Sequence, residues 1–71
     1  MYLEILAINL KALRESKNMT QKEFADSLSV SDKTISKWET LKSMPDIITL
    51  KKISRIYSVS IDYLVGNENG K

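Results

Sequence analysis

Two lysines four positions apart, Lys33 and Lys37, are the residues of this 71-residue sequence best placed to do chemistry. At about 100° per residue, a helix would bring both to one side, almost directly opposite Ile35. The residues beside them are short and polar: Asp32, Thr34, Ser36 and Thr40. Such a polar, basic face suits the base acceptors and phosphates of a DNA major groove. Taken alone, however, the two lysines favour an ordinary solvated helix face.

The residue types that catalysis usually needs are scarce. The sequence contains no histidine and no cysteine, and its acidic residues are scattered. We find no glycine-rich phosphate loop and no grouping of a nucleophile, a base and an orienting residue. We therefore expect no enzymatic activity, no metal site and no cofactor.

Composition indicates one small globular domain in the cytoplasm. The chain is 42% apolar and 28% charged, with a formal net charge of +2, which is only a weak sign of a nucleic-acid partner. No apolar run approaches the roughly 20 residues that cross a bilayer, and the first residues lack a signal-peptide pattern. We expect a soluble, cytoplasmic protein with no membrane partner. Because only a short stretch follows Gly66, we also expect no small-molecule effector.

The pattern along the chain predicts an all-α fold. Apolar residues recur at spacings of three and four almost throughout, while Pro45, Gly66 and Gly70 are the only proline and glycines. We predict a domain over residues 1–66 and a short flexible tail over 67–71. The five expected short helices cover about 4–17, 21–28, 32–40, 47–57 and 61–65.

The joint between the second and third helices is sharply marked. Thr20 and Glu23 have the spacing of a capping box, and Ser31 is a good N-cap for the third helix. Ile35 and Trp38 should fix that helix against the second one. We therefore expect Trp38 in the core rather than as a platform for stacking bases.

These features resemble the lambda-repressor/Cro-like, or Xre-type, helix-turn-helix family of transcriptional regulators. The resemblance spans about residues 6–66 and rests on NLKALR (9–14), MTQKEFA (19–25), VSDKTISKWE (30–39), PDIITL (45–50) and VSIDYL (59–64). It implies five helices with the helix-turn-helix at helices two and three. It also implies a third helix that enters the major groove, usually within a homodimer on a palindromic operator. Repression by occluding a promoter is the commonest outcome.

The resemblance assigns roles by position. Candidates for contacts with DNA base edges are Asp32, Lys33, Ser36 and Lys37. Candidates for contacts with the DNA backbone are Gln21, Thr34, Thr40, Lys42 and Ser43. Arg14 and Glu39 match a largely buried structural ion pair. Two residues keep a second interpretation, because Asp32 could simply favour the helix start and Gln21 could be an ordinary first-turn residue.

The sequence departs from the family pattern at two turns. Ser29 and Leu41 stand where the family often has glycine. If either position needs a left-handed backbone, a residue with a side chain costs roughly 1 kcal/mol or more.

In the first helix, Leu6, Leu10 and Leu13 form the apolar stripe that faces the core. The N-terminal segment carries further apolar residues on the opposite side: Met1, Ile5, Ile8 and Ala12. Either the residues before Ile5 are not helical and fold back over Tyr63 and Leu64, or this face is a self-association surface. The function also keeps an alternative, a protein-interaction module such as an antitoxin-like partner-binding domain.

Overall fold

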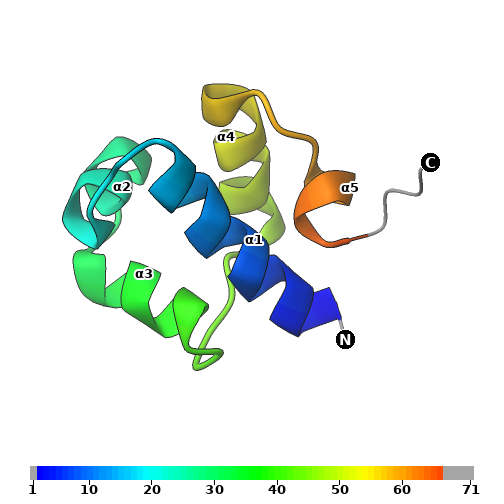
Figure 1. The fold of residues 1–71 in the computed structure, drawn as a ribbon, viewed down its shortest axis with the longest axis horizontal. Helices are drawn as coiled ribbons and strands as arrows, with labels where there is room; N and C mark the ends of the chain where they lie inside the picture. The colour runs from blue at the N-terminus through cyan, green and yellow to red at the C-terminus, as the bar shows by residue number, and fades with distance from the viewer. Residues whose placement is uncertain (1, 67–71) are drawn as a thin grey trace.

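The computed structural model describes residues 2–66, which form helices joined by short turns (Figure 1). No strand occurs within that range. The elements are α1 (Tyr2–Ser16), α2 (Gln21–Leu28), α3 (Asp32–Glu39), α4 (Ile47–Tyr57) and α5 (Ile61–Leu64). The predicted all-α fold with five short helices is confirmed.

The N-terminal helix is longer than the sequence predicted. α1 already begins at Tyr2 rather than near residue 4, and Glu4 in its first turn has a favourable position near the positive end of the helix dipole. The idea that residues before Ile5 fold back as non-helical chain is therefore wrong for residues 2–4. Leu6 and Ala7 of this helix are buried in the core. Met1 and the predicted tail, residues 67–71, lie outside the described residues.

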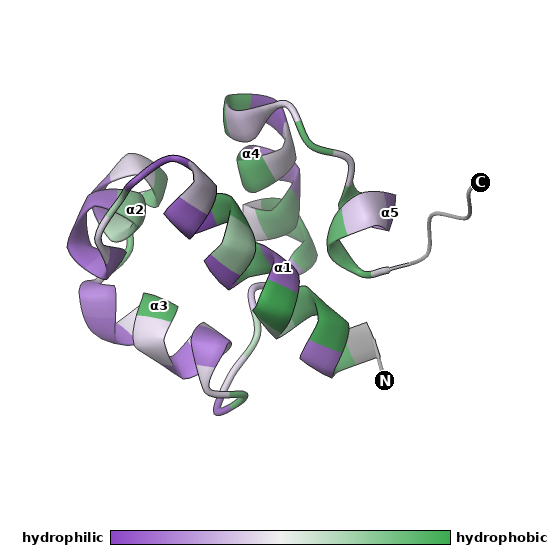
Figure 2. Cartoon of the chain, in the orientation of Figure 1, coloured by the Kyte–Doolittle hydropathy of each residue, from purple (hydrophilic) through white to green (hydrophobic). Residues whose placement is uncertain are grey.

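The core lies where all five helices converge. The side chains with essentially no exposure come from each helix: Leu10, Phe24, Ile35, Ile53 and Leu64. Hydrophilic residues dominate the outward sides of α2 and α3, whereas much of α1 is hydrophobic (Figure 2). α2 and α3 are thus polar on their outer sides and packed by apolar residues on their inner sides.

The helix starts follow local sequence chemistry. Four capping side chains each accept a hydrogen bond from a backbone N–H in the first turn: Thr20, Ser31, Asp46 and Ser60. The capping box is complete, with the Glu23 N–H donating to Thr20 Oγ1 at 3.1 Å and the Thr20 N–H donating to Glu23 Oε1 at 2.8 Å. Caps of this kind each stabilise a helix by about 1 kcal/mol, and the predicted caps Thr20 and Ser31 are confirmed.

Two side chains donate hydrogen bonds to backbone carbonyls at the end of another helix, and the sequence analysis predicted neither contact. Asn9 Nδ2 on α1 donates to the backbone carbonyls of Tyr63 (3.0 Å) and Leu64 (3.2 Å) on α5. Lys52 Nζ on α4 donates to the carbonyl of Leu28 at 3.0 Å, which places a cation at the negative end of α2. The carbonyls of Leu28 and Leu64 lie at helix ends, where the backbone offers no internal partner, and the Tyr63 carbonyl also accepts the Gly66 N–H at 3.1 Å.

The two turns that lack the expected glycine do adopt left-handed backbones. Ser29 has φ 59° and Leu41 has φ 65°. Asn18 and Ser58 share this conformation, with φ 57° and 55°. Ser29 and Leu41 therefore meet the condition under which a side chain is expected to cost roughly 1 kcal/mol or more, and the helices on either side are intact.

Candidate nucleic-acid interface

The α2–α3 joint holds α3 rigidly. Ala25 on α2 is 1% exposed, and its carbonyl accepts the N–H of Val30 at 3.0 Å. From α3, Ile35 and Trp38 enter the core with 0% and 3% exposure. Trp38 is therefore a core residue, as predicted, and cannot stack on bases.

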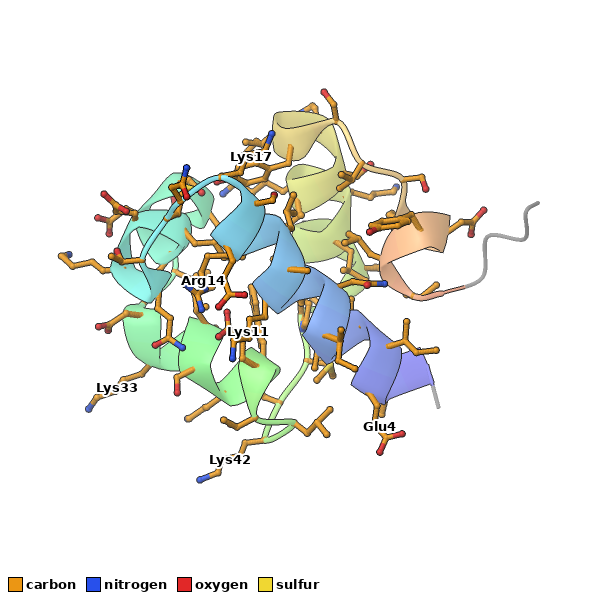
Figure 3. All side chains as sticks on the ribbon, viewed as in Figure 1. Glu4, Lys11, Arg14, Lys17, Lys33 and Lys42 are labelled. Carbon is orange, nitrogen blue, oxygen red and sulfur yellow. The ribbon has the colours of Figure 1, made fainter. Side chains whose placement is uncertain are left out.

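The opposite face of α3 is open. Asp32, Lys33 and Lys37 are exposed, and Ser36 and Thr34 are partly exposed. Figure 3 shows Lys33 projecting away from the rest of the molecule. Within residues 2–66, neither Lys33 nor Lys37 forms an ion pair. The face that the sequence singled out is consequently basic, and no described segment of the chain covers it.

The hydroxyl groups near this face are partly engaged within the protein. Thr34 Oγ1 lies 3.0 Å from Ser31 Oγ, within the cap of α3. Thr40 Oγ1 donates to the carbonyl of Ser36 at 2.8 Å, which uses the proton that a phosphate contact would need. Thr40 is therefore less well prepared for the predicted backbone contact than the other candidates.

The loop after α3 continues the basic surface. The backbone N–H groups of Lys42 and Ser43 both donate to the Lys37 carbonyl, at 2.8 and 3.3 Å, so the loop is anchored to the end of α3. Both residues are exposed, and Lys42 projects beyond the end of α3 as Lys33 does near its start (Figure 3). The loop candidates thus follow directly on the end of α3.

The predicted ion pair between α1 and α3 is present. Arg14 Nε donates to Glu39 Oε2 at 2.8 Å, and Arg14 Nη2 donates to Glu39 Oε1 at 3.2 Å. The two side chains are 12% and 6% exposed. Arg14 Nη1 also donates to the Met19 carbonyl at 2.8 Å, which joins the α1–α2 turn to the pair. This bidentate geometry is the strongest that an arginine and a carboxylate can form.

The surroundings keep both partners charged. Burial raises the pKa of Glu39, but hydrogen bonds from Arg14 and Gln21 and the charges of Arg14 and Lys11 outweigh it and lower the pKa below its ordinary value. The hydrogen bond to Glu39 raises the pKa of Arg14, and desolvation opposes it. Figure 3 shows Lys11 reaching from α1 toward this cluster. Sequence reasoning gave Lys11 no role, because its partner is far along the chain.

Gln21, the predicted phosphate contact, already has a partner inside the protein. Its Nε2 donates to Glu39 Oε1 at 3.1 Å, so the first residue of α2 is joined to the last residue of α3. The side chain remains partly exposed. No local sequence pattern could have revealed this bond between residues on two different helices.

The fold and this surface define a helix-turn-helix domain whose second helix in the motif is presented to solvent. A helix-turn-helix family model matches residues 10–64. The chain belongs to this family, of the Xre-type, lambda-repressor-like kind. Its relatives are transcriptional regulators in the main rather than enzymes.

Several of the similar proteins are named as HTH-type transcriptional regulators. The chain is 48% identical over 59 residues to the HTH-type transcriptional activator BcrR of Enterococcus faecalis, covering 83% of this chain and 29% of that protein. It is 40% identical over 63 residues to the HTH-type transcriptional regulator ImmR of Bacillus subtilis, covering 89% and 50%. The chain therefore spans half or less of the length of these relatives.

A third relative is an enzyme. The type II methyltransferase M.SsoII of Shigella sonnei is 38% identical over 74 residues, covering 93% of this chain but only 18% of the methyltransferase. No solved structure matches significantly. Residues 2–66 also contain no helix long and apolar enough to span a membrane, and no group of three or more residues arranged to hold a metal ion.

Proposed function

We propose that this chain binds duplex DNA in a sequence-specific manner and regulates transcription, with α3 inserted into the major groove. The observation that carries this proposal is the outer face of α3, which is basic, exposed and held rigid by Ile35 and Trp38 from behind. A major groove admits one such helix and offers acceptors on its bases and charge on its backbone. A cytoplasmic location is part of the proposal, and DNA as the partner supports it.

The roles follow the position of each residue. Base edges are read from the α3 face by Asp32, Lys33, Ser36 and Lys37. Phosphates are bound from the start of α2 and from the edge and end of α3 by Gln21, Thr34, Thr40, Lys42 and Ser43. Of these, Thr40 must first give up its hydrogen bond to the Ser36 carbonyl.

A homodimer on a palindromic operator is part of the proposal, because one helix reads only a few base pairs. The α1 face supports self-association, since Ile8 remains 67% exposed beside Leu41, which is 49% exposed. Ile5, by contrast, packs against Gly66 at the end of α5. We favour repression by promoter occlusion, although the relative BcrR is named an activator.

Salt dependence tests the proposal. Affinity for duplex DNA should fall linearly with salt on logarithmic axes as counterions are released. The double variant Lys33→Ala/Lys37→Ala removes two cations from the interface, so it should weaken binding at least about ten-fold and make the slope less steep. The matched control, Lys17→Ala/Lys51→Ala, removes two exposed lysines outside the proposed interface and should change the slope much less.

The outcome also separates the alternative function. Binding that ignores salt, or no binding to duplex DNA at low salt, would favour a protein-interaction module instead. Selection of bound duplexes from a random pool then gives the operator, its symmetry and the half-site spacing. A non-palindromic selected site would argue against the homodimer.

A further inference from the structure

The carboxylate of Glu39 serves two partners at once. Oε2 accepts from Arg14 Nε at 2.8 Å, while Oε1 accepts from both Arg14 Nη2 (3.2 Å) and Gln21 Nε2 (3.1 Å). Its side chain is only 6% exposed, so these contacts replace water. Glu39, the last residue of α3, thus holds the side chain of Gln21, the first residue of α2, in place.

This contact decides which way the Gln21 amide points. A glutamine amide has a donor side and an acceptor side, whereas an ionised carboxylate only accepts hydrogen bonds. Gln21 must therefore turn Nε2 toward Glu39, because the reverse orientation would bring its carbonyl oxygen against the carboxylate. One Nε2 hydrogen is used in this way, and the second is left for another acceptor.

The charges around Glu39 make this arrangement compatible with a nearby phosphate. A lone carboxylate at the start of α2 would repel a DNA backbone. Here Arg14 pairs with it directly and Lys11 adds a second positive charge close by. Glu39 can therefore orient Gln21 without making the site anionic.

We propose that Glu39 is a positioning residue for DNA binding, which fixes the Gln21 amide so that its free hydrogen is ready for a phosphate oxygen. The inference rests on the proposed function, since it assumes that Gln21 meets the DNA backbone. It assigns Glu39 a role beyond joining α1 to α3. The fixed amide loses little conformational entropy on binding, which is the benefit of preorganisation.

The test measures how much DNA affinity Gln21→Ala costs when Glu39 is present and when it is replaced. Affinity for a duplex selected by the wild-type chain is measured by fluorescence anisotropy in three backgrounds: wild type, Arg14→Met/Glu39→Met and Glu39→Gln. The first variant removes both charges, which avoids leaving either one unpaired. The second keeps the size of Glu39, but its amide can also donate, so both orientations of Gln21 become possible.

In the wild-type background, Gln21→Ala should weaken binding about ten-fold, the size expected for a hydrogen bond to a charged group. In the two altered backgrounds the same substitution should cost about two-fold or less. Lys37→Ala serves as the control and should cost the same in all three, since Lys37 lies on the opposite face of α3. An equal cost of Gln21→Ala in every background overturns the inference.

Two further readouts separate positioning from a merely structural role. Gln21 is neutral, so losing its contact should leave the salt slope unchanged, whereas a displaced α3 would lower the slope. Side-chain ¹⁵N relaxation in the DNA-free protein should show a rigid Gln21 amide in wild type and a mobile one in both variants. A mobile amide in wild type overturns the inference even if DNA binds. A wild-type chain that binds no duplex, with a rigid amide, refutes the proposed function instead.

Discussion

The two sides of α3 are built for different tasks. The inner side carries Ile35 and Trp38, at 0% and 3% exposure, together with the Glu39 carboxylate that α1 and α2 share. The outer side carries Lys33 and Lys37, which are exposed and form no ion pair within the described residues. On this eight-residue helix, the side chains of the inner side have partners inside the protein, whereas the lysines of the outer side have no ion-pair partner in the described residues.

This contrast makes a general point about binding helices. On the inner side the Glu39 carboxylate accepts hydrogen bonds from Arg14 and Gln21, and no buried side-chain nitrogen or oxygen in the described residues lacks a hydrogen bond. The charges on the outer side gain little from folding. Substitutions on the inner side should therefore change the free energy of unfolding, and those on the outer side should change affinity.

The largest effect is expected at the inner side. Glu39→Ala should lower the free energy of unfolding by about 3 kcal/mol, because Arg14, only 12% exposed, would lose its counter-charge. Urea denaturation measures the change. The control is Glu15→Ala, whose carboxylate is 59% exposed and 4.0 Å from Arg14, and which should cost less than about 0.5 kcal/mol. Similar losses for the two variants would contradict the contrast between the faces.

On the outer side, Lys37→Ala should weaken binding to the selected duplex about ten-fold and reduce the preference for that duplex over random DNA. Its unfolding free energy should stay within about 0.5 kcal/mol of wild type. Anisotropy titrations and urea melts on the same sample measure both quantities. A stability loss as large as that of Glu39→Ala would show that the outer face also contributes to folding.

A smaller gain is expected at the turns on either side of α3. Ser29→Gly should stabilise the fold by about 0.5–1 kcal/mol, because glycine relieves the left-handed backbone and loses part of that gain to its freer unfolded state. Leu41→Gly should act in the same direction. Ser43→Gly, at an exposed loop position without a positive φ, is the control and should not stabilise. Thermal melts would contradict this account if Ser29→Gly lowered the melting temperature.

The smallest effect concerns pH. Because folding lowers the pKa of Glu39, its contribution to stability is complete above the ordinary value of 4.5 and is lost as pH falls through the lowered pKa of the folded state. Wild type should therefore lose more stability on acidification below about pH 5 than Arg14→Met/Glu39→Met does. Asp46, whose pKa a backbone hydrogen bond from Thr49 also lowers, is present in both proteins. The difference between their urea-melt pH profiles thus isolates Glu39, and parallel profiles would contradict the prediction.

Much of the local structure could be predicted from sequence, because its causes are local. Caps such as Thr20 and Ser31 bond to residues three positions away, and the spacing of Ile35 and Trp38 is visible along the chain. The Arg14–Glu39 pair came from the family resemblance rather than from spacing. The early start of α1 was missed, because no residue before Glu4 is of a capping type that would mark the first turn.

The amino-acid sequence alone determined the five helices, their caps and the polarity of each helix face, because these depend on interactions within about one helical turn. Tertiary structure alone decided that Gln21 would donate to Glu39, that Lys52 would close the end of α2 and that Asn9 would tie α1 to α5. Those contacts join residues from different helices, and their partners become neighbours only after the core has set the angles between the helices.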